Sequence, residues 1–188
     1  HFIYNAIANL QGLIGDQQTE RANSYLVAFS QFIRKQLELN REETITLQEE
    51  IEAIEIYVKL QQMRYENRFT FHVETDLDTE AYLLPPMLIQ PFVENAIEHG
   101  FKNINYQGVL TLTIEEKDNK LHLILIDNGN GKGVSNPHKK SLSKLITQER
   151  LDLLFNTQQK GNAYFEAAPL SPPETGYRVI IVIPVIPS

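Results

Sequence analysis

The sequence predicts an α+β protein in which a helical hairpin is followed by a two-layer α/β sandwich with a mixed sheet. Three observations support this. Apolar residues recur at helical spacing over the first 40 residues, a further helix begins behind a capping signal at Thr46, and short alternations of apolar and polar residues fill much of the remainder. The chain has 188 residues, enough for one ordinary domain with a small unit attached. We therefore expect two units, over residues 1–40 and 45–188.

The first unit is the predicted hairpin. Residues 1–14 repeat apolar side chains at alternating spacings of four and three, which places them on one helix face, and Gly15-Asp16 ends the run. A second amphipathic stretch follows, with its apolar positions between Tyr25 and Leu37. A hairpin this small cannot bury both apolar faces alone. We therefore expect a homodimer in which two hairpins form a four-helix bundle.

The second unit is expected to begin after a short linker. Residues 40–46 are largely polar and are assigned to this linker. Thr46 and Glu49 then form a capping-box pattern, in which each side chain accepts a hydrogen bond from the backbone amide of the other residue. The apolar positions beyond them predict a helix over residues 47–65.

Strands are predicted where apolar and polar residues alternate. Asp118-Asn119 is typical of a hairpin turn and joins two of these strands. Helices over 47–65, 86–99 and roughly 141–156 would cover one face of the resulting mixed sheet. The predicted strands are residues 69–73, 110–114, 121–126 and 177–185.

Composition excludes several classes of function. The net charge of −7 and the pI near 5.3 leave no basic surface of the kind that binds nucleic acid. The absence of cysteine excludes disulfides and thiolate metal sites and fits a reducing compartment. No apolar run approaches the roughly 20 residues that span a bilayer. Because the first residue is His and not Met, we expect a cytoplasmic piece of a longer protein.

The segment over residues 84–100 carries the most specific signal. A proline pair opens an apolar helical run that contains Asn95, has acidic residues on either side of it and closes with His99-Gly100. A buried amide without a partner costs free energy. Mg²⁺ with a polyphosphate would supply a partner, because an amide oxygen is a suitable ligand for this ion. The alternative for Asn95 is a surface asparagine with local hydrogen bonds.

Two basic side chains follow Asn95 closely. His99 lies one helical turn further on, and Lys102 lies just beyond the helix. Both are candidate contacts for phosphate. The alternatives are a structural histidine with satisfied hydrogen bonds and a solvated surface lysine.

A second motif, Asp127-Asn128-Gly129-Asn130-Gly131, follows directly on a predicted strand. A carboxylate at the end of a buried strand can accept a hydrogen bond from the adenine amino group. Gly129 and Gly131 would allow positive φ and a close approach of the backbone to the base. Asp-Asn-Gly also marks ordinary hairpin turns. The polar, Gly-containing residues 132–140 suit a lid over the phosphates.

These two motifs resemble the N box and the first glycine box of the ATP-binding fold that sensor histidine kinases share with type II topoisomerases, Hsp90 and mismatch-repair ATPases. The sequence of residues 84–100 and the opening motif His1-Phe2-Ile3-Tyr4-Asn5 resemble the corresponding segments of the LytS-type (YehU-like) sensor histidine kinases. The resemblance implies a Bergerat (GHKL) ATPase-like catalytic domain over 45–188. It also implies a dimerisation and histidine phospho-acceptor hairpin over 1–40.

The same resemblance implies a mechanism. His1 would take the γ-phosphoryl group of ATP and pass it to an aspartate on a response-regulator receiver domain, and Asn5, on the same helix face, would orient the phosphoryl group or a water. A neutral imidazole is a competent nucleophile near pH 7. Asn95 would hold Mg²⁺. A membrane-embedded sensor upstream, in the inner membrane, is implied by the family alone. The alternative for His1 is a tag-derived or frayed terminal histidine.

The sequence departs from the family pattern at two places. Ser141-Leu142-Ser143-Lys144 stands where relatives have a second glycine box, although Ser141 and Leu142 could still offer helix N-terminal amides to phosphate. Gly176-Tyr177 stands where relatives have Gly-Thr, which removes a hydroxyl expected near the adenine. These changes bear on nucleotide affinity and on the autokinase rate.

Two other functions remain open. A hydrolase of the topoisomerase or Hsp90 kind needs a catalytic Glu four residues before Asn95, where this chain has Pro91, which cannot act as a base. Glu94 is adjacent to Asn95 but points elsewhere on the helix. A nucleotide-binding dimerisation module without kinase activity is the other alternative.

Overall fold

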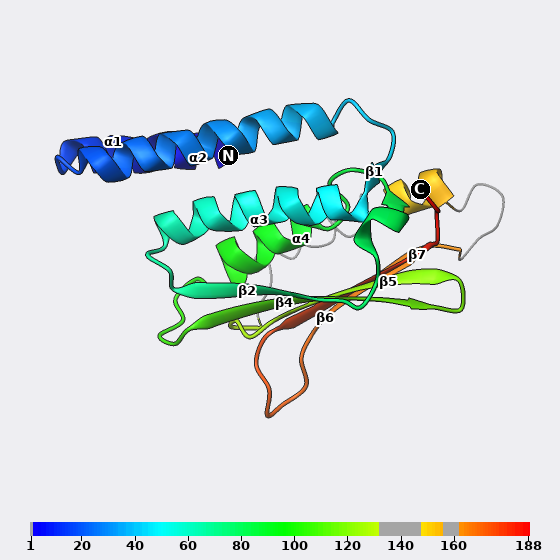
Figure 1. Cartoon of the computed structure of the whole chain (residues 1–188). Coiled ribbons are helices and arrows are strands. Elements are labelled where there is room, and N and C mark those ends of the chain that lie inside the picture. The colour runs from blue at the N-terminus through cyan, green and yellow to red at the C-terminus, as the bar shows by residue number, and fades with distance from the viewer. Residues whose placement is uncertain (1, 132–147, 156–161) are drawn as a thin grey trace.

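The chain forms three stacked layers in the computed structural model, which describes residues 2–131, 148–155 and 162–188. A five-stranded sheet is the lowest layer in Figure 1, helices α3 (Leu47–Arg64) and α4 (Gln90–Asn95) cover one of its faces, and a helical hairpin lies on the outer side of these helices. The predicted α+β class and the two-layer sandwich are confirmed. No helix within the described ranges is long and apolar enough to cross a membrane.

The hairpin consists of α1 (Phe2–Gly15) and α2 (Thr19–Leu39), and the predicted break at Gly15-Asp16 is confirmed. Its apolar residues divide into two groups. Tyr25 and Phe32 of α2 are buried against the rest of the molecule, where the Phe32 ring lies 5.6 Å from the ring of Tyr57 in α3. The other group faces outward, and the exposed fractions of its α1 members are 52% for Ile3, 46% for Ile7 and 61% for Ile14.

The predicted linker is wrong at its end. Ile45 and Thr46 form strand β1 (Ile45–Thr46), which pairs antiparallel with β3 (Leu83–Leu84). Ile45 is buried, because it packs with Leu39 and Ala53 in a small apolar cluster of its own. The capping box at the start of α3 is confirmed: the Glu49 amide donates to Thr46 Oγ1 at 3.1 Å, and the Thr46 amide donates to Glu49 Oε2 at 2.8 Å.

The main sheet has the strand order β2-β4-β5-β7-β6. Its β2–β4 pair is parallel and its other pairs are antiparallel, so the predicted mixed sheet is confirmed. Asp118 and Asn119 both have positive φ, 53° and 58°, which is the backbone of the predicted hairpin turn. Strand β6 was not predicted from the sequence. It lies at the edge of the sheet and has no fully buried side chain, and its residues show no clear alternation of apolar and polar types. The strands are β2 (Phe69–Glu74), β4 (Gly108–Lys117), β5 (Lys120–Asp127), β6 (Tyr164–Pro169) and β7 (Tyr177–Pro184).

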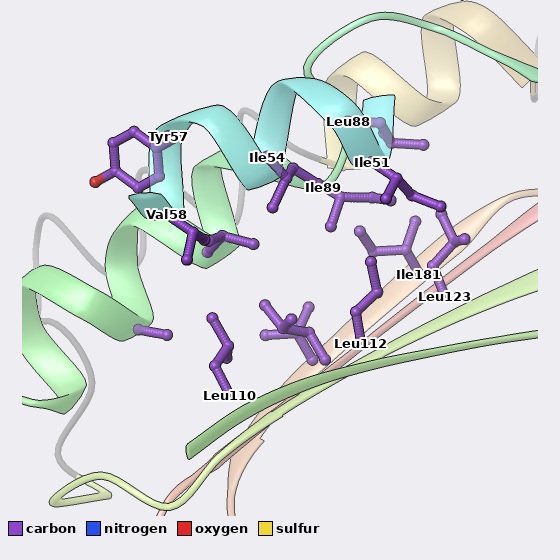
Figure 2. Close-up of a cluster of buried hydrophobic side chains, with 14 of the residues drawn as sticks. Ile51, Ile54, Tyr57, Val58, Leu88, Ile89, Leu110, Leu112, Leu123 and Ile181 are labelled. Atoms are coloured by element: carbon purple, nitrogen blue, oxygen red, sulfur yellow. The ribbon is translucent and has the colours of Figure 1, made fainter. Parts of the chain in front are cut away.

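The core lies between the helical layer and the sheet (Figure 2). Ile51, Ile54 and Val58 project from α3 towards the strands, and Leu110 and Leu112 project from β4 towards them. All of these side chains are at most 6% exposed, and burying each side chain of this size contributes about 1.5–3 kcal/mol. This core fixes α3 and the start of α4 against the sheet.

The helix predicted over 86–99 begins later and ends differently. Residues 85–89 form an irregular turn in which Met87 has a φ of 57°, and the α-helix α4 starts only at Gln90. A π-helical turn, η2 (Ala96–Gly100), closes the segment. Such turns often occur at functional sites.

Two shorter helical pieces complete the fold. A 3₁₀ turn, η1 (Thr79–Ala81), precedes β3. Residues 148–155 are helical, which agrees with the C-terminal part of the helix predicted over roughly 141–156. The remainder of that predicted helix lies outside the described residues.

Candidate nucleotide-binding site

The structure brings the two predicted motifs together at one end of the molecule. Asn130, in the loop after β5, donates its backbone amide to the Gly100 carbonyl at 2.9 Å. Its side-chain Nδ2 donates to the carbonyls of His99 at 3.1 Å and Lys102 at 3.2 Å. The glycine-rich loop is therefore bonded to the C-terminal end of the helix that carries Asn95.

Asp127 ends β5 and is 6% exposed. Its Oδ1 accepts a hydrogen bond from the Gly129 amide at 2.8 Å. Burial raises the pKa of this carboxyl to about 6, against the opposing effect of hydrogen bonds from the Gly129 and Tyr177 backbones. A buried acceptor with a pKa in this range can interact with a hydrogen-bond donor on a ligand.

Two glycines make this close packing possible. A Cβ on Gly129 would lie 2.4 Å from the Gly100 carbonyl oxygen, and a Cβ on Gly100 would lie 3.2 Å from Asp127 Oδ1. The expectation of positive φ was right for Gly131, at 68°, but wrong for Gly129, which is not among the positive-φ residues. Gly129 is required for the contact with the neighbouring helix and not for its backbone angle.

Asn128 has a structural role that the sequence did not indicate. Its Oδ1 accepts from the Val109 amide at 2.7 Å and its Nδ2 donates to the Gln107 carbonyl at 3.1 Å. The Tyr106 hydroxyl donates to the Asn128 carbonyl at 2.8 Å. These bonds fix the loop that follows Asp127 to the start of β4.

The other predicted residues of the helix lie near this loop. Asn95 is the last residue of α4 and is half-buried, and its side chain makes no capping hydrogen bond to the π-helical turn. His99 is half-buried within that turn, and Lys102 is exposed just beyond it. The carbonyls of His99 and Lys102 thus lie beside the loop that follows Asp127, and Asn95 lies one helical turn before His99.

Several predicted residues lie outside the described part of the chain. These are His1, Ser141 and Leu142, together with the segment expected to be a lid, residues 132–140. Asn5, the partner expected for His1, is half-buried on α1. Next to His1, the ring of Phe2 lies 4.8 Å from Phe32 and 5.7 Å from Tyr57, so the start of α1 is anchored on α3.

Glu50 and Arg150 were missed by sequence reasoning. Glu50 is completely buried, and its carboxylate accepts from the amides of Met87 at 2.9 Å, Ile89 at 2.9 Å and Gln90 at 3.4 Å. Arg150 Nη1 donates to the Met87 carbonyl at 3.0 Å, and Nη2 donates to the Pro86 carbonyl. One signal could have found Glu50: it occupies a position on the apolar face of α3, three residues after Leu47.

A buried polar chain joins the hairpin to α4. Gln36 Nε2, from α2, donates to Gln90 Oε1 at 2.7 Å, and Gln90 Nε2 donates to Glu94 Oε1 at 2.9 Å. Burial is the main factor that raises the pKa of Glu94, and the nearby charge of Glu98 adds to it. Glu94 is thus held on the side of α4 that faces the hairpin.

The donor set fits a magnesium nucleotide better than a metal held by protein alone. Among the described residues there is no group of three or more His, Asp or Glu that could hold a metal ion. Mg²⁺ commonly uses one or two protein oxygens and completes its shell with phosphates and water. The amide oxygen of Asn95 is of that kind.

Comparisons with known proteins show which family and fold this chain resembles. The Histidine kinase family model matches residues 1–69. Among solved structures, the catalytic domain of histidine kinase ThkA aligns over 77% of this chain and 97% of its own, with a TM-score of 0.54 and 16% identity. Histidine kinase AdeS of Acinetobacter baumannii aligns over 97% of this chain and 94% of its own, with a TM-score of 0.52 and 12% identity. The solved structures show that the chain has the fold found in histidine kinases.

Relatives that are similar in sequence identify the family of this chain more closely. The sensor protein LytS of Staphylococcus epidermidis is 38% identical over 131 residues, which are 70% of this chain and 22% of that protein. The sensor histidine kinase/phosphatase LytS of Staphylococcus aureus is 33% identical over 135 residues, which are 72% of this chain and 23% of that protein. The chain belongs to the LytS-type sensor histidine kinases of two-component systems. It spans less than a quarter of the length of these curated relatives.

Proposed function

We propose that this chain is a kinase core that phosphorylates its own His1 from Mg-ATP and passes the phosphoryl group to an aspartate of a response-regulator receiver domain. The observation that carries the proposal is the bonding of the glycine-rich loop to the end of the Asn95 helix, through Asn130. It supports a single site in which Asp127 binds the base and the side-chain amide of Asn95 lies near the phosphates of the same nucleotide.

In this site Asp127 accepts a hydrogen bond from the adenine amino group. Gly131, with its positive φ, lets the backbone come close to the base, while Gly129 keeps the loop packed against the end of the Asn95 helix. His99 and Lys102 offer positive charge or hydrogen bonds to the phosphates. Ser141 and Leu142 would add backbone amides from the segment that precedes the 148–155 helix. Asn95 would hold Mg²⁺, which when bound neutralises phosphate charge.

The chemical step belongs to His1. A ring nitrogen of the neutral imidazole attacks the γ-phosphorus, the bond from that phosphorus to the bridging oxygen breaks, and ADP leaves. The imidazole loses its proton, and Asn5 orients the transferred group. Phosphoryl transfer of this type depends mainly on positioning and charge stabilisation.

The two units have distinct roles in this proposal. Residues 1–40 are the dimerisation and phospho-acceptor hairpin, and residues 45–188 are the catalytic ATP-binding domain. The outward apolar residues of α1, Ile3, Ile7 and Ile14, support a homodimer, because contiguous exposed apolar surface usually marks an interface. The parent protein would be anchored in the inner membrane by an upstream sensor segment, with this part in the cytoplasm.

Incubation with γ-labelled ATP tests the proposal. We expect a protein-bound label that is acid-labile and base-stable and that is lost in His1→Gln. Steady phosphate release without protein labelling would instead support a hydrolase. Nucleotide protection against melting with neither activity would support a nucleotide-binding dimerisation module.

A further inference from the structure

The segment that leads into α4 is held from two sides by side chains that are distant in sequence. On one side, the Glu50 carboxylate accepts hydrogen bonds from the backbone amides of Met87, Ile89 and Gln90. On the other side, the Arg150 guanidinium donates to the carbonyls of Pro86 and Met87. We call Glu50 and Arg150 the clamp.

Both carboxyl oxygens of Glu50 act as acceptors in this arrangement, and the three amides oppose the rise in pKa that burial imposes on this group. Oε2 accepts from the Met87 amide, and Oε1 accepts from the amides of Ile89 and Gln90. A glutamine in its place would direct its Nε2 donor at one of these amides and leave that amide unsatisfied. A buried group left without a partner is destabilising, so this position discriminates between Glu and its isosteric amide.

The clamp holds a backbone that would not adopt this shape unaided. Met87 has a φ of 57°, in the left-handed region that non-glycine residues seldom occupy. Its amide is bound by Glu50 and its carbonyl by Arg150, so both of its peptide groups are fixed. Backbone strain of this type persists only where the surroundings impose it.

The position of Asn95 follows from where α4 begins. Helix α4 has only six residues, from Gln90 to Asn95, and Glu50 bonds to the amide of its first residue. A rotation or shift at Gln90 is passed through this short helix to Asn95 at the other end. Displacements of about 1 Å at a reacting group can cost about a hundredfold in rate.

We propose that Glu50 and Arg150 are positioning residues for phosphotransfer, which set the orientation of Asn95 towards the metal-bound phosphates. Arg150 also connects the turn over residues 85–89 to the helix over 148–155, so a shift of that helix would be passed to the start of α4. This inference rests on the proposed function. In the proposed site neither Glu50 nor Arg150 contacts the nucleotide.

The metal dependence of binding separates positioning from simple loss of stability. Adenosine binding depends on Asp127, in the other motif, whereas the gain in ATP affinity on adding Mg²⁺ depends on Asn95. Dissociation constants are therefore measured for adenosine, for ATP with a chelator and for ATP with Mg²⁺. Asn95→Ala defines complete loss of the metal-dependent gain.

The variants are Glu50→Gln, Arg150→Met and the conservative Arg150→Lys. Controls are Glu55→Gln, an exposed acid on α3, and Arg68→Met, an exposed arginine in a loop. We expect Glu50→Gln and Arg150→Met to weaken Mg-ATP binding about tenfold, the equivalent of one lost hydrogen bond. Adenosine binding should stay within about twofold, and Arg150→Lys should retain part of the metal-dependent gain because an ammonium can still donate to one carbonyl.

The double variant provides an independent check. Because both residues hold the same segment, Glu50→Gln combined with Arg150→Met should weaken Mg-ATP binding less than the product of the single effects. Equal losses for adenosine and Mg-ATP, or no loss for either, would overturn the positioning role. If Glu50→Gln does not fold, Arg150→Met decides: a fully retained metal-dependent gain in that variant refutes the inference. A wild-type protein without any nucleotide binding would overturn the proposed function as well.

Discussion

The buried carboxyl of Asp127 makes adenine recognition depend on pH. Burial raises its pKa from 3.8 to about 6. A protonated carboxyl presents an O–H where the adenine amino group needs an acceptor, so the ionised form binds the base. At pH 5 about one tenth of this carboxyl is ionised, and adenosine affinity should be about tenfold lower than at pH 8.

Adenosine is the appropriate ligand for this measurement, because it has no phosphate that titrates over the same range. Calorimetric titrations between pH 5 and pH 8 should show affinity rising through about pH 6 and then levelling. Asp127→Asn should bind weakly at every pH, without the rise. Asp118→Asn, in the exposed β4–β5 turn, should behave like the wild type. An adenosine affinity that is constant from pH 5 to pH 8 would refute the assignment of Asp127 to the base.

The same carboxyl also makes the stability of the ligand-free protein depend on pH, but this stability contribution decreases as the pH rises, whereas adenosine affinity increases. The folded state binds this proton more tightly than the unfolded state, so the contribution of Asp127 to stability falls as the pH rises from about 4 to about 6. The rise in pKa corresponds to at most about 3 kcal/mol against the ionised form at pH 8. Asp127→Asn should therefore leave the Tm at pH 8 unchanged or higher while abolishing adenosine binding, a combination that general unfolding would not produce.

Three further variants test other parts of the structure. Gln36→Leu should lower the free energy of unfolding by about 1–3 kcal/mol in chemical denaturation, because the substitution leaves the buried Gln90 with an unpaired acceptor. The control Gln31→Leu, at an exposed position, should change the free energy of unfolding little. Equal effects of the two substitutions would argue against the buried polar chain. Ile7→Asp should convert the dimer to monomer in sedimentation experiments, and an unchanged mass would exclude this face as the interface. Gly129→Ala should abolish nucleotide binding in the same titrations, because the added Cβ would collide with the backbone of the neighbouring helix. The control Gly12→Ala has open space around the added Cβ and should raise the Tm slightly. Nucleotide binding by Gly129→Ala would contradict the close packing of the loop.

Features that depend on neighbours in sequence were predictable. The capping box of Thr46 and Glu49 and the turn at Asp118-Asn119 satisfy their hydrogen bonds or backbone angles within a few residues, so their residue types alone indicate the structure. The Asn95 and Asp127 motifs were recognisable in the same way. Each has a fixed spacing within one helix or one loop.

The linker and the Asn95 helix show where local reasoning failed. Ile45 pairs as a strand because Leu84 lies opposite it, and the residues before Gln90 leave the helical conformation because Glu50 and Arg150 bind their amides and carbonyls. These partners are far away in sequence, and no local pattern indicates them.

The sequence by itself determined which segments carry the family's motifs, and the order of the main helices and of four of the five strands in the main sheet around them. Tertiary structure alone decided that Asn130 joins the two motifs, that Gly129 is needed for contact with a helix, and that a buried acid on α3 sets the start of α4. The reason is physical: a local pattern encodes the conformation of its own backbone, whereas buried polar groups take their partners from whichever element the packed core brings within hydrogen-bonding distance.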